Sequence, residues 1–172
     1  MEDINKHMKD MFLKAYSDYA DAIFRYCLMR IGDREKAVDL VQETFMKTWI
    51  YMQKDITILN IRAFLYKTAG NLVIDEYRKR KPIDSLEAIN EETGFEPSLD
   101  LTSFLIDKID GAGAVALLGK IPEPYGQVIF MRFVEELSLS EIAEITGQTE
   151  NAIAVQVHRG IAKLQKLFNH EK

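Results

Sequence analysis

Two segments of the chain carry polar side chains at spacings that place them on one face of a helix. Within residues 34–52, Asp39, Gln42, Glu43 and Met46 follow the i, i+3, i+4, i+7 pattern. Two acids and an amide on one helical face suit a basic groove or an Arg-bearing helix of a partner. The alternative interpretation is a solvated helix face with no partner.

A second helical segment, about residues 61–78, presents Lys67, Asn71, Asp75 and Arg78 on one face and runs into a basic cluster. The cluster is Arg78-Lys79-Arg80-Lys81, and Pro82 discourages further helix. Such side chains can contact phosphates, which supply affinity without sequence information. Positive charge also stabilises a helix C-terminus, but that role needs only one or two of the four charges.

Helices must position these side chains, and the apolar spacing predicts them over residues 12–31, 34–52 and 61–78, with a turn at Gly32-Asp33. Cys27 lies on an apolar stripe and is interpreted as a small core residue. Trp49 and Phe64 are likewise expected in the core. Further helices are expected over residues 114–120 and from Tyr125 to about 133.

The C-terminal segment has the pattern of two short helices joined by a tight turn. Ser138 and Glu141 fit a capping box, Gly147 fits the turn, and Thr149 can cap the next helix. This layout is that of a helix-turn-helix, whose second helix places its N-terminal part near the bases of duplex DNA. The expected inner positions of that helix are Ile153, Val157, Ile161, Leu164 and Phe168.

Charge is unevenly distributed along the chain. The net charge of −5 over 172 residues separates into +3 for residues 1–81, −7 for residues 82–113 and −1 for residues 114–172. This asymmetry indicates a mildly basic module, an acidic connector and a near-neutral module. The hydrophobic content of 47% excludes a chain that is disordered throughout.

Several classes of protein are disfavoured by what the sequence contains. A single cysteine excludes a disulfide framework and a Cys-rich zinc site, which makes a cytoplasmic location the default. The first residues lack the apolar core of a secretory signal, and no stretch approaches a membrane span. The three histidines are too scattered to predict a metal site, and no phosphate loop or catalytic pair is evident. We expect no cofactor, no metal, no membrane partner and no enzymatic activity.

Three stretches of the chain form a further pattern. They are Ala37-Val38-Asp39-Leu40-Val41-Gln42-Glu43-Thr44-Phe45, the segment from Phe64 to Asp75 with the basic cluster after it, and Pro124-Tyr125-Gly126-Gln127-Val128-Ile129 through Glu141-Ile142-Ala143 to His158-Arg159. Together these stretches resemble the compact, extracytoplasmic-function group of bacterial RNA polymerase sigma factors. Each pattern alone is weak, whereas their order around an acidic linker is specific.

The resemblance implies partners and roles for the first module. Asp39, Gln42, Glu43 and Met46 would dock on the clamp helices of the polymerase β′ subunit. The face with Asn71 and Asp75 would read the opened minus-ten element, holding flipped bases of the non-template single strand. The remaining contacts there would come from Lys67, Arg78, Lys79, Arg80 and Lys81. Tyr66 and Tyr77 would either stack on bases or serve in packing, and Gly70 stands where the family usually has a basic or larger residue.

For the second module, the resemblance implies reading of the minus-thirty-five duplex and contact with the polymerase β flap. The residues concerned would be Thr149, Asn151, Ala154, Val155, Gln156, His158 and Arg159. The chain departs from the family pattern here: basic residues are missing at Ala154, Gln156, Ile161 and Gly126, and Glu136 takes a turn position where Gly is common. Because basic contacts dominate affinity for duplex DNA, we expect weak binding by this module.

The expected fold is all-α, with two small helical domains joined by an acidic linker and a helix-turn-helix in the second. The boundaries are 8–81, 82–113 and 114–170. The expected function is to direct core RNA polymerase to promoters and to promote their opening, with an anti-sigma protein as a further partner. The alternatives are a sigma-like interaction protein with weakened DNA binding and a stand-alone helix-turn-helix regulator.

Overall fold

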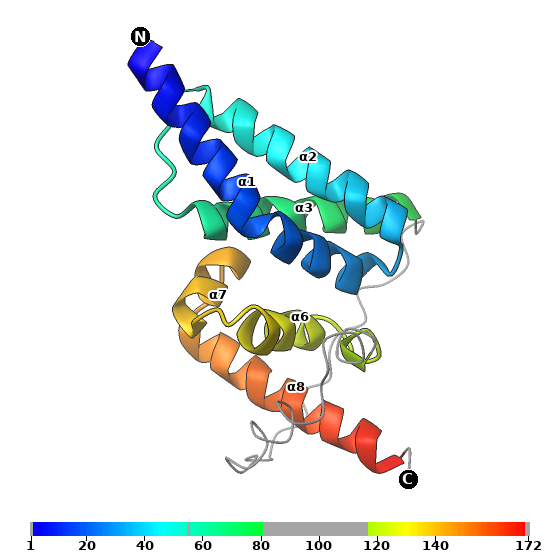
Figure 1. The fold of residues 1–172 in the computed structure, drawn as a ribbon. Coiled ribbons are helices and arrows are strands. Elements are labelled where there is room, and N and C mark those ends of the chain that lie inside the picture. The colour runs from blue at the N-terminus through cyan, green and yellow to red at the C-terminus, as the bar shows by residue number, and fades with distance from the viewer. Residues whose placement is uncertain (1, 55, 81–116, 171–172) are drawn as a thin grey trace. The chain divides into compact units, whose positions relative to one another are not determined.

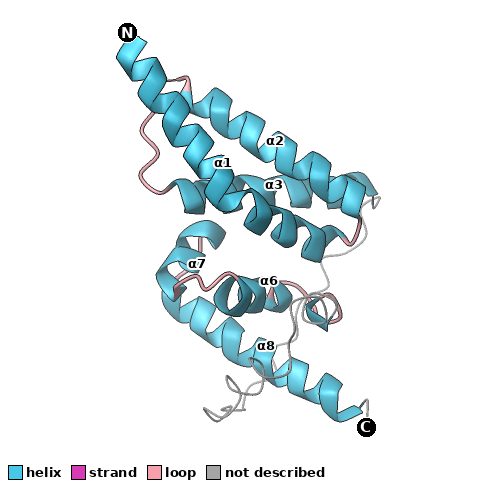
Figure 2. Ribbon diagram, in the orientation of Figure 1, coloured by secondary structure: helices cyan, strands magenta, loops and turns pink. Residues whose placement is uncertain are grey.

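The computed structural model describes residues 2–54, 56–80 and 117–170, and every element in these ranges is a helix (Figure 2). The predicted all-α class is therefore confirmed. The chain divides into two compact units, Met1–Pro82 and Ile83–Lys172. Lys81, the acidic segment 82–113 and the first residues of the helix expected over 114–120 lie outside the described ranges.

The first unit packs three helices against one another: α1 (Glu2–Ile31), α2 (Arg34–Met52) and α3 (Ile61–Arg80) (Figure 1). The expected start of the first helix at Phe12 is wrong, because α1 begins at Glu2. Residues 3–11 are mostly exposed and so lack an apolar stripe, but they contain no Gly or Pro to break a helix.

Local capping groups set the ends of these helices. Gly32, with φ +69°, ends α1 and donates its N–H to the Leu28 carbonyl at 2.8 Å. Asp33 then caps α2 by accepting from the Lys36 N–H at 3.1 Å. Asn60 caps α3 in the same way, accepting from the Ala63 N–H at 3.0 Å. The turn predicted at Gly32-Asp33 is therefore confirmed.

The core of the first unit lies where the three helices meet. Ile23, Tyr26 and Cys27 of α1 are fully buried, as are Leu65 and Tyr66 of α3. The rings of Tyr26 and Tyr66 pack edge to face with centroids 5.4 Å apart, a favourable aromatic geometry.

The two other aromatic residues expected in the core are half-buried and also serve in packing. Trp49 lies edge-on to Phe12 at 5.0 Å, and Phe64 lies 4.7 Å from Tyr51.

The second unit contains α6 (Tyr125–Ile129), the π-helix η1 (Phe130–Val134), α7 (Leu139–Thr146) and α8 (Glu150–His170). The helix expected from Tyr125 thus changes to π geometry at Phe130. The chain then turns at Glu136, which adopts φ +55°. At Gly160 a Cβ would lie 2.9 Å from Cγ1 of Ile129, so α6 and α8 approach too closely there for a larger residue.

Candidate functional site

The polar face predicted on α2 is formed and accessible. The buried side of this helix comprises Ala37, Leu40, Val41, Thr44, Phe45, Thr48 and Met52. Asp39 and Gln42 are exposed on the other side, Met46 is 57% exposed, and Glu43 is half-buried with an ion pair to Lys47 at 3.5 Å. The structure therefore brings the four residues together on one surface.

Sequence reasoning missed two apolar members of this α2 surface. Val38 is 40% exposed and Ile50 is 47% exposed, and both lie outside the buried stripe of α2. Val38 lies eight residues before Met46 and Ile50 lies four residues after it, and this spacing could have placed both on the same side of the helix. They were missed because an apolar residue in a helix is usually assigned to the core. Carboxylates beside exposed aliphatic side chains form a surface suited to a protein partner.

The polar face predicted on α3 is exposed as well, at Lys67, Asn71, Asp75 and Arg78. The carboxylate of Asp75 lies 3.8 Å from the Arg78 guanidinium, and both side chains are mostly exposed. Such a pair is weak and exchangeable in water.

The basic cluster at the end of α3 is partly neutralised by Glu76. Lys79 and Arg80 are exposed, and Arg80 donates its Nε–H to the Glu76 carboxylate at 3.2 Å. The same carboxylate lies 3.7 Å from Nζ of Lys36 on α2, which ties the two helices together. The cluster therefore presents less unpaired positive charge than its four basic residues would supply on their own.

Three residues of α3 that were considered for contact with DNA face the interior of the first unit instead. Tyr66 is fully buried against Tyr26, so it is a packing residue. Tyr77 is half-buried and donates its hydroxyl hydrogen to the Arg30 carbonyl at the end of α1. Gly70 is buried, and a Cβ there would lie 3.0 Å from the Tyr26 hydroxyl. Position 70 therefore faces the interior, so its glycine serves packing and does not leave a gap in the exposed polar face of α3.

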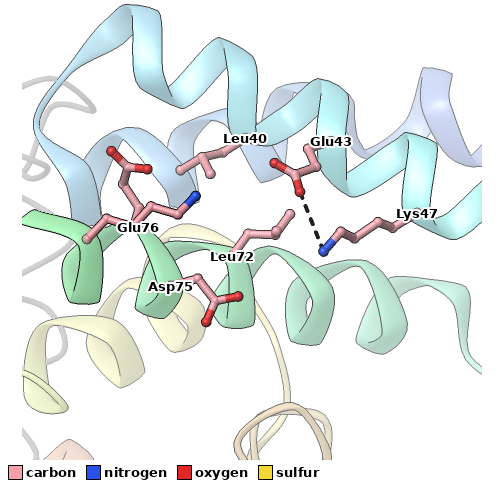
Figure 3. A pocket seen from close by; sticks show the side chains of 7 residues that line it. Leu40, Glu43, Lys47, Leu72, Asp75 and Glu76 are labelled. Atoms are coloured by element: carbon pink, nitrogen blue, oxygen red, sulfur yellow. Dashed lines mark ion pairs between the residues drawn. The ribbon is translucent and has the colours of Figure 1, made fainter.

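A shallow groove of about 390 Å³ runs between α2 and α3 (Figure 3). Its lining includes Glu43 from the α2 face and Asp75 and Lys79 from the α3 face, over a floor that contains Leu40 and Leu72. The two predicted surfaces of the first unit are thus neighbours across one groove.

The predicted helix-turn-helix is built by the capping groups that the sequence indicates. Ser138 accepts from the Glu141 N–H at 3.1 Å, and Glu141 accepts from the Ser138 N–H at 2.8 Å, which completes the capping box. Gly147 ends α7 with φ +69°. Thr149 accepts from the Ala152 N–H at 3.1 Å and caps α8. The local prediction is confirmed at each of these residues.

The residues singled out on α8 do not share one face. Asn151, Val155 and His158 are exposed, whereas Ala154 and Arg159 are half-buried. Gln156 lies beside the buried stripe and bonds back to the turn before α8. The predicted inner positions Ile153, Val157, Ile161 and Leu164 are buried, while the side chain of Phe168 is outside the described set.

The missing basic residue at Gly126 has a steric explanation. Gly126 is buried, and a Cβ at this position would lie 2.7 Å from the Leu118 carbonyl oxygen. Since a backbone atom cannot move aside cheaply, this position admits only glycine in the present packing.

Within the described residues, no group of three or more His, Cys, Asp or Glu side chains is placed to hold a metal ion. Among the described residues, no helix is both long enough and apolar enough to cross a membrane. Burial raises the pKa of the Cys27 thiol to about 12, which keeps it neutral and unreactive.

Comparison with known proteins finds two matching family models, and they follow one another along the chain in the same order as the two units. Residues 15–83 match Sigma-70 region 2, and residues 114–164 match Sigma-70, region 4. The ECF RNA polymerase sigma factor SigW of Bacillus subtilis (strain 168) is 29% identical over 176 residues, covering 96% of this chain and 93% of SigW. The RNA polymerase sigma factor SigV of the same strain is 26% identical over 159 residues, covering 92% of this chain and 91% of SigV.

A solved structure shares the fold. The sigma factor RpoE in complex with the anti-sigma factor NepR from Bartonella quintana superposes with a TM-score of 0.67 at 21% identity. The match covers 97% of this chain and 99% of that chain.

Proposed function

Because the chain belongs to the extracytoplasmic-function group of RNA polymerase sigma factors, we propose a division of labour between its two units. The protein directs core RNA polymerase to promoters as a transcription initiation factor. The observation that carries this function is the succession of a region 2 match over residues 15–83 and a region 4 match over residues 114–164 in one chain.

The α2 surface is assigned to the clamp helices of the polymerase β′ subunit. Asp39, Gln42 and Glu43 would bind basic groups of the clamp, and charge-assisted hydrogen bonds of this kind are the stronger ones. Met46, with Val38 and Ile50 beside it, would supply the apolar contact area. The exposure of all three aliphatic side chains supports this assignment.

The α3 face is assigned to the opened minus-ten element. Asn71 and Asp75 would bind the pairing edge of unstacked bases of the non-template strand. Lys67, Arg78 and Lys79, with Arg80 and Lys81, would contact the phosphates and fix the register. The weak Asp75–Arg78 ion pair supports these roles, because both partners can exchange it for contacts with DNA.

The second unit is assigned to the minus-thirty-five duplex and the β flap. Asn151, Val155 and His158 present their side chains to solvent on α8, beside Ala154 and Arg159, and Thr149 fixes the start of the helix. With few cations on this helix, the unit would bind its element weakly and depend on the polymerase to hold it in place. We further infer a cytoplasmic location and a regulatory anti-sigma partner, the latter in line with the NepR-bound relative.

The test is initiation in vitro with purified core polymerase, the full-length protein and fragments of its own genome, with transcript starts mapped. Starts that share an upstream motif are the expected result. The variant Asp39→Lys with Glu43→Lys provides the control, since it should lose these starts together with binding to core polymerase.

Two other outcomes would contradict the assignment in different ways. Binding to core polymerase without specific starts favours an interaction protein that has lost promoter recognition. Specific binding to duplex DNA without binding to polymerase favours a stand-alone regulator.

A further inference from the structure

Two glutamines are joined across the helix-turn-helix. Nε2 of Gln156, in the second turn of α8, donates to Oε1 of Gln148 at 2.5 Å. Gln148 lies in the turn between α7 and α8, eight residues earlier, and both side chains are partly buried. The bond therefore connects the body of the second helix to the turn that precedes it.

The backbone on both sides of Gln148 is fixed. Its N–H donates to the Ala143 carbonyl at 3.1 Å, directly after Gly147 in the left-handed conformation. Thr149, the next residue, caps α8 through the Ala152 N–H. With the backbone held by these bonds and the side chain held by Gln156, the amide of Gln148 has a defined position.

The direction of the bond determines what Gln148 can offer to a ligand. Oε1 of Gln156 is buried without a hydrogen-bond partner among the described residues. The reverse orientation would bury the Gln156 NH₂ group instead, and orphaned buried N–H groups are rarer than orphaned carbonyls. Gln156 is therefore the donor and occupies the carbonyl of Gln148. The Nε2 group of Gln148 retains its hydrogens, and the hydrogen bonds of the described residues include no acceptor for them.

We propose that Gln148 contacts the minus-thirty-five duplex as a hydrogen-bond donor and that Gln156 is its positioning residue. The ligand group is an acceptor on DNA, either a phosphate oxygen or the N7 or O6 edge of a purine. This inference rests on the proposed role of α8, since the N-terminal residues of a recognition helix contact base edges and the first helix crosses the DNA backbone, which places the turn between them close to the duplex. It replaces the prediction that Gln156 itself reads a base.

The first test compares Gln148→Ala, Gln156→Ala and the double variant in reconstituted holoenzyme on a promoter found with the wild-type protein. Each single variant should reduce initiation about two- to tenfold, the effect of one neutral hydrogen bond. The double variant should lose no more than Gln148→Ala, because Gln156 acts through Gln148. Gln165→Ala on the same helix is the matched control and should leave initiation unchanged.

The second test reverses the polarity of the Gln148 amide. In Gln156→Glu the introduced carboxylate can only accept, so Gln148 turns its NH₂ group inward and its carbonyl outward. On a set of minus-thirty-five variants, a contact to a purine edge predicts a changed preference at one base pair. A contact to a phosphate predicts a uniform loss over all sequences. Gln165→Glu controls for the added negative charge.

Thermal unfolding of each variant separates a loss of contact from a loss of fold. The inference is overturned if the wild-type holoenzyme initiates normally and Gln148→Ala does so equally well with unchanged base preference. It is also overturned if the loss in Gln148→Ala matches a lowered unfolding temperature and Gln156→Glu changes neither the base preference nor the level of initiation beyond the effect of Gln165→Glu. If the wild-type protein itself supports no initiation, the proposed function fails and the inference falls with it.

Discussion

The hydroxyl of Tyr26 lies 3.0 Å from the place that a Cβ of residue 70 would occupy, so α1 and α3 approach closely at Gly70 and a side chain there would push the buried Tyr26 hydroxyl aside. The Tyr26 hydroxyl also accepts from the buried Arg30 guanidinium at 2.8 Å. Gly70 therefore serves helix packing, and its helix-propensity cost of about 1 kcal/mol is the consequence of that contact. The close approach fixes the rotation of α3 and leaves Asn71, the next residue, exposed.

The α2 surface yields a prediction about polymerase binding. Reversing both charges with Asp39→Lys and Glu43→Lys should weaken binding to core polymerase at least about tenfold, since charged hydrogen bonds contribute about 1.5–3 kcal/mol each. Binding to labelled core polymerase measures the effect. Asp3→Lys with Asp10→Lys changes the net charge equally on exposed positions of α1 and should bind normally. Equal losses in both variants would show that net charge, rather than this surface, controls docking.

The α3 face yields a prediction about promoter choice. Asn71→Ala and Asp75→Ala should each change the base preferred in the minus-ten element while binding to core polymerase persists. Both side chains are exposed, so the fold should tolerate their removal. Mapped starts on a randomised minus-ten library measure the preference. A parallel loss of polymerase binding would point to misfolding or to a wrong assignment of the face.

The shortage of cations on α8 predicts a gain of affinity from a single basic residue. Ala154→Arg should strengthen holoenzyme binding to promoters that contain the upstream duplex. The slope of log affinity against log salt should steepen by about 0.9, the value for one phosphate contact. Binding titrations at several salt concentrations test this, with Gln165→Arg on the same helix as control. An unchanged slope in Ala154→Arg would place residue 154 away from DNA.

The left-handed turn at Glu136 predicts a stabilising substitution. A non-glycine residue at φ +55° is strained by about 1–2 kcal/mol, whereas glycine adopts this conformation freely. Glycine also has more conformational entropy in the unfolded chain, and this offsets about 0.5–1 kcal/mol of the strain that is relieved. Glu136→Gly should therefore raise the unfolding free energy of the second unit by up to about 1 kcal/mol in denaturant titration. A lower value would mean that Glu136 makes contacts worth more than its strain.

The buried thiol predicts a pH dependence. The pKa of Cys27 is raised from 9.0 to about 12 in the folded protein by burial. As the pH rises, the Cys27 thiol loses its proton in the unfolded chain before it does so in the folded protein. The stability that depends on the neutral buried thiol is therefore complete below pH 9 and declines as the pH rises toward 12. Alkylation of Cys27 should be negligible in the native protein at pH 8 and rapid in urea. Rapid alkylation of the native protein would contradict the burial of the thiol.

Local signals in the sequence were sufficient for much of the fold. Ser138 and Glu141 lie three residues apart and cap the helix through their own backbone, so their pairing needed no knowledge of the rest of the chain. The same holds for Gly32, Asp33 and Thr149. By contrast, the start of α1 was missed because its first turns are exposed and carry no apolar period.

Tertiary contacts decided what the sequence could not. Position 70 faces Tyr26, a residue 44 positions earlier, and Gln156 turns toward Gln148 instead of outward. The spacing of residues in the sequence predicts which face of a helix a side chain lies on, but it does not predict which residue of another element that side chain contacts. The candidate surfaces of the first unit were therefore predictable as faces, whereas the partners of their individual residues were not.

The two-residue connection at Gly32-Asp33 limits how this protein can change length. One residue inserted into the start of α2 would turn the remaining helix by about 100°, which would bury Asp39 and expose the core stripe. The connection between α2 and α3 is eight residues long, so one residue added there need not turn either helix. Lineages of this protein should therefore gain or lose residues in that longer connection and keep the first connection at constant length.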